Sequence, residues 1–282
     1  MMFAKIAFLV NQKAGKKNIS HFISWATNQL DSQKIDFQLF NDNWPSSLDT
    51  FTDVWVVGGD GTINYFINKY PHCLIPIVLF KGGTGNDFAT QLYGNLSNQE
   101  IFKKVIVTSP KYVDAGRFNN MLYLNCLGIG FDGEVLRAMT AIRFIGGHFG
   151  YLIAVLINIF SFREKRITIR SAKNYRNERF LLAMINNSPK AGGGFHIAPP
   201  AKIDDGVLDM VLISKLPIIK RLRFLPVIEK GKHLHLPFVI HERGHLFEIN
   251  AEMLLPIQVD GELKFADSIK VTVLPRKFLF RY

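Results

Sequence analysis

A glycine-rich turn between a buried strand and a helix is the feature that most constrains this fold. Residues 53–57 read DVWVV, a short apolar run typical of a strand covered on both faces, and residues 62–70 carry apolar side chains at helical spacing. Gly58, Gly59 and Gly61 lie between the two segments. Glycine lets a ligand approach the backbone closely, and the start of a helix offers unpaired N–H groups. The pattern therefore predicts a phosphate-binding turn.

The same strand-to-turn pattern occurs twice more in the first part of the chain. An apolar run over residues 5–10 ends in a polar turn over 11–17, and a run over 74–80 ends in the glycine-rich turn KGGTGND over 81–87. A helical segment over 22–30, a strand over 37–40 and a helix over 88–92 complete the alternation. This order is typical of an α/β domain with a parallel sheet, which binds ligands at the carboxyl ends of its strands. We assign it to residues 1–109.

From about residue 110 the chain becomes rich in strands. The strand-like segments are 112–118, 121–127, 167–170, 180–186, 207–213, 247–251 and 269–274. We therefore expect a mostly antiparallel β domain over residues 110–275.

Composition indicates the kind of partner and the cellular compartment that this protein requires. The formal net charge of +11 favours an anionic partner, which can be a nucleotide, a nucleic acid or an acidic membrane. Cys73 and Cys126 allow at most one disulfide and form no ligand cluster, which indicates a reducing compartment. The first residues lead directly into a strand-like run without a signal-peptide pattern, so we expect a cytoplasmic protein.

Two segments bear on membrane contact. Residues 144–162 carry no formal charge, but glycines interrupt the first half, so we expect a buried helix over 151–160 rather than a membrane span. Residues 216–235 interleave apolar and basic side chains. That pattern fits either a surface resting on anionic lipid or a solvated helix whose apolar face joins the core.

One apparent motif does not fit its context. His241 and His245 flank a glutamate in the spacing of a zinc protease, but Gly244 disfavours a helix and the flanking residues alternate as two strands around a turn. Neither glycine-rich turn has the spacing of a P-loop or of a dinucleotide-binding fingerprint. Two tight turns with capped helix starts are the alternative to phosphate binding.

Four motifs give the chain a family resemblance. They are residues 58–62 (GGDGT), 83–89 (GTGNDFA), 192–195 (GGGF) leading to Pro199 and 204–209 (DDGVLD), and 259–262 (VDGE). With these motifs the chain resembles the bacterial diacylglycerol kinases and their lipid-kinase relatives, which include sphingosine and ceramide kinases. The resemblance implies a nucleotide-binding α/β domain and a β-sandwich domain, with the active site in the cleft between them. It also implies that residues 276–282 return to the first domain.

The resemblance also implies roles for particular residues. It places Glu262 as the general base with Asp260 beside it, and Asp60 in a hydrated Mg²⁺ network. One carboxylate that accepts the hydroxyl proton suits phosphoryl transfer to an alcohol, although Asp-Gly alone indicates only a β-turn. The residues implied at ATP are Asn11, Gly15, Gly58, Gly59, Asp60, Gly61, Thr62, Asn64, Gly83, Thr84, Gly85, Asn86 and Asp87.

A structural Mg²⁺ in the β domain is implied as well. The matching positions are the carboxylate of Asp205 and the main-chain carbonyls of Lys202 and Val207. Oxygen ligands suit this hard cation, and a solvated acidic turn is the alternative.

The sequence departs from the family pattern at four positions. Gln12 and Ala14 occupy the usual proline and serine places of the first loop, and Lys81 stands where a proline normally precedes the second loop. Tyr65 replaces the glutamate that usually follows Asn64. Contacts to the nucleotide are therefore expected to differ in detail, above all near Asp60.

Together these observations predict an ATP- and Mg²⁺-dependent lipid kinase that phosphorylates a hydroxyl group, with diacylglycerol as the first candidate. We expect peripheral contact with an anionic membrane surface and no nucleic-acid partner, because no reader motif is present. The oligomeric state stays open, with a homodimer among the options. The alternatives are a nucleotide-binding regulator that has lost catalysis and a kinase for a soluble acceptor, in the manner of NAD kinase.

Overall fold

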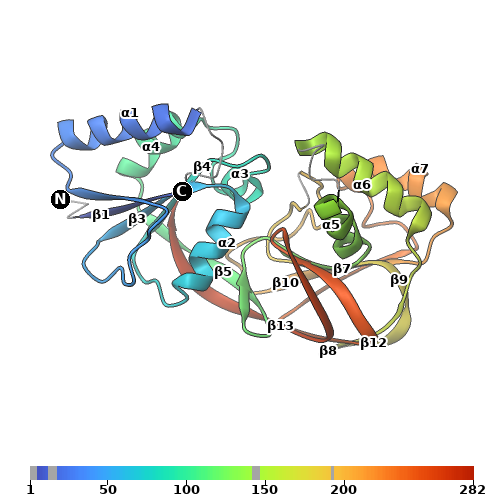
Figure 1. Ribbon diagram of the computed structural model, residues 1–282. Helices are drawn as coiled ribbons and strands as arrows, with labels where there is room; N and C mark the ends of the chain where they lie inside the picture. The colour runs from blue at the N-terminus through green and yellow to red at the C-terminus, as the bar shows by residue number, and fades with distance from the viewer. Residues whose placement is uncertain (1–4, 12–17, 142–146, 192–193) are drawn as a thin grey trace. The chain divides into compact units, whose positions relative to one another are not determined.

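The computed structural model describes residues 5–11, 18–141, 147–191 and 194–282 (Figure 1). Its contacts divide the chain into two compact units. Unit 1 consists of Met1–Val113 and Arg276–Tyr282, and unit 2 consists of Asp114–Pro275.

Unit 1 is built on a parallel sheet. Its strands are β1 (Ile6–Val10), β2 (Phe37–Asn41), β3 (Asp53–Gly58) and β4 (Ile77–Lys81), in the order β2-β1-β3-β4. The last part of β13 (Glu262–Arg281) pairs with β4 in parallel. The helices are α1 (Asn18–Ser32), α2 (Asp60–Lys69), α3 (Asp87–Tyr93) and α4 (Asn98–Val107). The predicted α/β architecture of the first part of the chain is confirmed.

A buried ion pair fixes the final residues of the chain in unit 1. Nε of Arg281 lies 2.6 Å from Oδ1 of Asp53 at the start of β3, and the guanidinium also donates to the carbonyl of Thr108. Burial raises the pKa of Asp53, and Arg281 opposes that shift. The Tyr93 hydroxyl donates to the carbonyl of Arg281. These contacts hold the end of β13 against the sheet.

Unit 2 is a mostly antiparallel β structure, as predicted. Its strands are β5 (Pro110–Phe118, which begins in unit 1), β6 (Met121–Tyr123), β7 (Cys126–Gly130), β8 (Arg166–Ser171), β9 (Tyr175–Asn186), β10 (Leu208–Ser214), β11 (Val239–Gly244), β12 (Leu246–Val259) and the first part of β13. The order is β11-β10-β9-β7-β12-β13. Because β8 pairs with both β9 and β12, the pairings β7-β9-β8-β12-β7 close the sheet on itself around an apolar core.

Three helices lie together on one side of the sheet of unit 2 (Figure 1). They are α5 (Phe131–Ala141), α6 (Gly147–Ser161) and α7 (Ile218–Glu229). A second group of buried apolar side chains, from β9, β10 and the segment 191–201, faces these helices. The helices and strands together enclose an apolar pocket.

The structure decides several local expectations from the sequence. Helix α6 covers the helix predicted over 151–160 and extends it, and no helix among the described residues is long and apolar enough to cross a membrane. The zinc-protease pattern is divided between strand and turn, with His241 on β11 and His245 between β11 and β12. His241 contacts Asp209 at 2.6 Å, whereas His245 contacts the carbonyl of Gly206. The two histidines therefore have different partners and do not share one helical face, as the zinc-protease pattern would require.

Two strand predictions were wrong in their bounds. The run over 74–80 becomes a strand only from Ile77, because Pro76 has no N–H group to donate to the sheet. The single strand expected over 121–127 is interrupted between β6 and β7. The N–H groups of Leu124, Asn125 and Cys126 donate instead to the carboxylate of Asp260, which takes them out of the ladder.

Candidate active site

Asn11 and the two glycine-rich turns lie at one edge of the sheet of unit 1. They follow β1, β3 and β4, which are neighbours in the sheet, with Val10 opposite Val57 and Gly58 opposite Lys81. The amide of Gly82 donates to the carbonyl of Gly58 at 2.9 Å. The turn before α2 and the turn before α3 are therefore in direct contact.

The glycines of these turns pack backbone against backbone. A Cβ atom on Gly59 would lie 2.8 Å from Cα of Gly83, and one on Gly83 would lie 2.6 Å from Cα of Gly59. A Cβ on Gly82 would similarly lie 2.9 Å from Cα of Gly58. Gly61 differs, because it is exposed at the start of α2 and a Cβ there would meet no protein atom within 4 Å. Gly59, Gly82 and Gly83 thus allow the two turns to pack closely, whereas the space beside Gly61 is open.

This contrast gives a prediction that separates the two roles. Gly59→Ala is expected to lower the free energy of unfolding by roughly 1–3 kcal/mol, because the new methyl group pushes the two turns apart. Gly61→Ala is expected to change it by less than about 1 kcal/mol, since alanine suits a helix and the space is open. Denaturant unfolding measures both effects. Weaker ATP binding by a fully folded Gly61→Ala variant would show that the nucleotide approaches this position, and equal destabilisation of both variants would contradict the assignment.

Two polar side chains organise the turns. The carboxylate of Asp60, the first residue of α2, accepts hydrogen bonds from the amides of Asp87 and Phe88 at 3.1 and 3.0 Å, which caps the start of α3. The Asn86 side chain exchanges hydrogen bonds with the amide and carbonyl of Gly83, and its φ of 54° lies in the left-handed region. Gly83, Thr84 and Gly85, in the turn that these hydrogen bonds hold, are exposed to solvent. Because the amides of Gly83, Asp87 and Phe88 already have acceptors, an anion at this edge would approach the exposed backbone of Thr84, Gly85 and the start of α2.

The remaining predicted residues of unit 1 have distinct positions. Nδ2 of Asn11 donates to the Thr62 hydroxyl at 2.9 Å, which links the loop after β1 to α2. Asn64 is buried on α2, where its Oδ1 accepts from Asn68 at 3.5 Å. Gly15, together with the departures Gln12 and Ala14, lies outside the described residues.

The other two departures have local structural explanations. The Lys81 ammonium donates to the carbonyls of Gly94 and Leu96, just after α3, and burial lowers its pKa. A proline could not make these bonds. Tyr65 is exposed on α2 and packs against Trp44 with ring centroids 5.5 Å apart. Both side chains stabilise unit 1 locally.

In unit 2, the two predicted carboxylates of the 259–262 turn have different surroundings. Asp260 is buried, has a φ of 47°, and accepts hydrogen bonds from three successive amides at 2.7–3.0 Å. Glu262, the first residue of β13, is exposed. The carboxylate of Asp260 thus holds the turn, whereas Glu262 is open to solvent.

The predicted metal position lies before β10. Oδ1 of Asp205 accepts the amide of Val207 at 3.3 Å, and Oδ2 pairs with the Arg243 guanidinium. Arg243 also approaches Asp209, at 3.6 Å. The described residues contain no group of three acidic, histidine or cysteine side chains arranged for a metal. A cation at Asp205 would have to compete with the Arg243 guanidinium. A Mg²⁺ held by the carboxylate of Asp205 and the main-chain carbonyls of Lys202 and Val207 stays a prediction.

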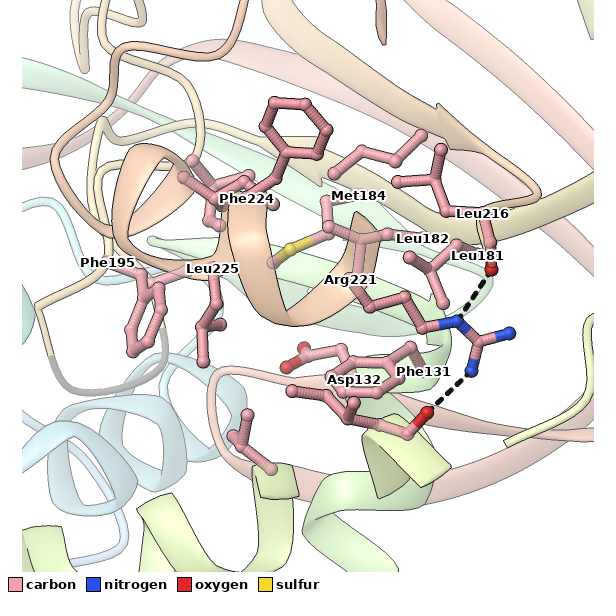
Figure 2. Close-up of a pocket in the computed structure, with 16 residues that line it drawn as sticks. Phe131, Asp132, Leu181, Leu182, Met184, Phe195, Leu216, Arg221, Phe224 and Leu225 are labelled. Carbon is pink, nitrogen blue, oxygen red and sulfur yellow. Dashed lines mark hydrogen bonds between the residues drawn. The ribbon is translucent and has the colours of Figure 1, made fainter. Parts of the chain in front are cut away.

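An apolar pocket lies between the three helices and the sheet of unit 2 (Figure 2). Its empty volume is about 700 Å³, including the open mouth. Sixteen side chains line it, and all but Asp132 and Arg221 are apolar. The Arg221 guanidinium is occupied by the carbonyls of Leu216, Ile159 and Phe162 and by the Glu164 carboxylate, 2.7 Å away.

Asp132 is the polar group that the pocket leaves without a protein partner. It is the second residue of α5, and its buried Oδ2 has no hydrogen-bond partner among the described residues. Burial raises its pKa to about 6. A Cβ on Gly128 would lie 2.2 Å from this oxygen, so the glycine makes room for the carboxylate. The sequence reading missed Asp132, although a strand ending in Gly128-Ile129-Gly130 before an acidic helix start was a usable signal.

The raised pKa of Asp132 predicts a pH dependence of stability. The folded protein holds the proton up to about pH 6, whereas the unfolded chain releases it near its ordinary value of 3.8. Stability from this group is therefore full below about pH 4 and falls as the pH rises through about 6. Asp132→Asn should remove this loss and be more stable by roughly 2 kcal/mol at pH 8. Parallel curves of unfolding free energy against pH for the two proteins would contradict this assignment.

Comparisons with known proteins agree with this geometry. A family model described as the diacylglycerol kinase catalytic domain matches residues 5–118, and the YegS C-terminal NAD kinase beta sandwich-like domain matches residues 125–279. A probable lipid kinase YegS-like of Shewanella frigidimarina is 30% identical over 237 residues, covering 80% of this chain and 75% of the relative. A diacylglycerol kinase of Bacillus subtilis is 23% identical over 228 residues, covering 77% and 73%.

Solved structures share the fold. A diacylglycerol kinase structure from Bacillus anthracis has a TM-score of 0.76 at 21% identity and covers 100% of this chain and 98% of that one. An NAD kinase from Archaeoglobus fulgidus in complex with ATP has a TM-score of 0.58 at 16% identity, with coverage of 98% and 93%. The two family models together span nearly all of the sequence, in the order of units 1 and 2. The chain therefore belongs to the family of diacylglycerol kinases and YegS-like lipid kinases, which are phosphotransferases with an alcohol group as acceptor.

Proposed function

We propose that this protein uses ATP and Mg²⁺ to phosphorylate the hydroxyl group of a membrane lipid. Diacylglycerol is the first candidate, and the product would be phosphatidic acid. The apolar pocket of unit 2 is the observation that carries this proposal.

The pocket has the chemistry of a lipid-binding site. Ligand pockets of this kind combine apolar walls with a few polar groups. Here the apolar walls suit acyl chains, and Asp132 offers one acceptor to the polar end of the lipid. A soluble acceptor such as a dinucleotide would bring many polar groups into a pocket that offers few partners, which disfavours that alternative.

Unit 2 also links the pocket to the turn that carries Glu262. A Cβ on Gly133 of α5 would lie 2.1 Å from the carbonyl oxygen of Pro256, so α5 begins directly against β12. Strand β12 leads into the turn at Asp260 and Glu262. The same strand thus supports the helix that carries Asp132 and the proposed general base.

The turns of unit 1 are the proposed phosphate site. The exposed backbone at Gly61, Thr84 and Gly85 suits the phosphate oxygens. Each oxygen of Asp60 accepts one amide and keeps further lone-pair capacity, so the carboxylate fits a hydrated Mg²⁺. When bound with ATP, Mg²⁺ would neutralise charge on the phosphates.

The reaction itself needs one proton acceptor on the protein. The lipid hydroxyl oxygen forms a bond to the γ-phosphorus of ATP, the bond from that phosphorus to the bridging oxygen breaks, and ADP leaves. Glu262 takes the hydroxyl proton, a role for which its exposure suits it. The substrate resides in a bilayer, so we also propose that the protein works at the cytoplasmic surface of a membrane in peripheral contact with anionic lipid.

A substrate panel tests the proposal. The purified protein is incubated with Mg²⁺, labelled ATP and micelles of diacylglycerol, a sphingoid base or a phospholipid, with NAD as a soluble acceptor. We expect label in diacylglycerol and none without Mg²⁺. Label in NAD alone would support the soluble-acceptor alternative. Bound ATP without label in any acceptor would support the regulator that has lost catalysis.

A further inference from the structure

Helices α6 and α7 carry apolar side chains on two faces each. The inward faces line the pocket with Val155 and Ile159 from α6 and with Phe224, Leu225 and Ile228 from α7. These contacts account for only part of the apolar surface of the two helices. The rest is exposed to solvent.

The outward face of α6 is apolar. Leu156, Ile157 and Phe160 lie at helical spacing on one side, and Phe160 is 61% exposed. Ala154, Asn158 and Ile159 on the opposite side are buried. The exposed residues thus form a stripe rather than scattered single side chains.

The outward face of α7 repeats this pattern. Ile218, Ile219 and Leu222 form an exposed stripe, and Ile219 is 80% exposed. The basic amphipathic stretch expected from the sequence is therefore a helix whose apolar residues divide between the pocket and the solvent. The sequence offered a lipid-contacting surface and a core-packed helix as alternatives, and neither interpretation included this division.

Arg221 holds the two stripes next to each other. Its guanidinium, on α7, donates at 3.0 Å to the carbonyls of Ile159 and Phe162 at the end of α6. Glu164 accepts from the same group at 2.7 Å, and this ion pair is buried. Figure 1 shows α6 and α7 next to each other on the helix-covered side of the sheet of unit 2. The six exposed side chains therefore belong to one surface, which we call the α6/α7 surface.

The charge around the α6/α7 surface is positive. The exposed basic residues of the adjoining segments are Arg163, Lys165, Lys215, Lys220, Arg223, Lys230 and Lys232. The acidic residues of segments 147–165 and 215–235 are Glu164, which is paired with Arg221, and Glu229. An apolar surface with a basic rim is complementary to the anionic headgroups and acyl chains of a bilayer.

We propose that the α6/α7 surface docks on an anionic lipid bilayer and that substrate lipid enters the pocket past these two helices. The docking surface and the pocket wall are different faces of the same helices, so a lipid can move between bilayer and pocket with little exposure of its chains to water. A second copy of the chain is a less suitable occupant, because it would bring the same positive charge to the interface. This inference deepens the proposed function and rests on it.

Vesicle flotation of the full chain tests the docking surface without any turnover. Vesicles contain either phosphatidylcholine alone or phosphatidylcholine with one-third phosphatidylglycerol. We expect binding to the anionic vesicles only, and we expect the double variant Phe160→Glu/Ile219→Glu to bind at least about tenfold more weakly. Leu74→Glu is the matched control, because Leu74 is 86% exposed but lies in unit 1. It should bind as the unchanged protein does.

The outcomes separate the docking surface from the proposed function. Equal binding by the double variant and the control, or a dimer that the double variant abolishes in light scattering, would overturn the docking proposal. Activity toward a short-chain diacylglycerol dissolved in water should be the same in both variants. If the unchanged protein bound vesicles but had no activity toward the short-chain diacylglycerol, the kinase proposal would be overturned and the docking proposal would stand.

Discussion

Replacing Glu262 with glutamine is expected to abolish phosphoryl transfer while leaving ATP binding and stability unchanged. A general base contributes about 10²- to 10⁴-fold to the rate, and glutamine has the same shape but cannot take the hydroxyl proton. Glu262 is exposed, so the structure loses no buried contact with this change. The measurements are kcat with diacylglycerol, the Kd for ATP and the thermal midpoint.

The control for this variant is Glu252→Gln. Glu252 is also exposed and lies on β12, the strand that precedes the turn, but it has no assigned role. Its kcat should equal that of the unchanged protein. Unchanged turnover by the Glu262→Gln variant would remove Glu262 from the mechanism.

Replacing Asp260 with alanine is expected to have its main effect on stability. The change leaves the buried amides of Leu124, Asn125 and Cys126 without their acceptor. Buried donors that lose a charged partner cost about 3–5 kcal/mol together, which corresponds to a fall in Tm of roughly 6–20 °C. Asp260→Asn keeps one acceptor oxygen and tolerates the positive φ, so its effect should be smaller.

Asp267→Ala provides the comparison, because Asp267 is an exposed acidic residue of β13. Its Tm should stay within about 2 °C of the unchanged protein. If Asp260→Ala kept full stability and lost only turnover, the carboxylate would act in the reaction rather than hold the turn. The paired variants at 260 and 262 thus separate the two acidic residues of one motif.

Local sequence patterns predicted the elements of unit 1 well. The run DVWVV is buried along its whole length as part of β3, and the glycines after it lead directly into α2. Such features depend on neighbours in the sequence, so periodicity and glycine positions suffice to find them. Helix α4 was missed, although Ser97 and Glu100 form a capping box, which is itself a local signal.

Long-range contacts were beyond the same patterns. The sequence reading placed Asp260 beside the general base, and only the fold brings residues 124–126 to its carboxylate. The raised pKa of Asp132 likewise comes from burial among side chains of strands and helices, some of them almost a hundred positions away in the sequence. The packing of Gly59 against Gly83 also needed the pairing of β3 with β4. A pattern within one segment carries no information about such partners.

Strand β13 has a consequence for how the protein folds during synthesis. Unit 1 is discontinuous, and Arg281 supplies the guanidinium that neutralises Asp53, a buried carboxylate at the start of β3. A ribosome that has released only residues 1–113 has therefore delivered a sheet with an uncompensated buried charge. We expect unit 1 to stay loosely folded until residues 276–282 are available, so that its sheet is completed only after unit 2 has been made.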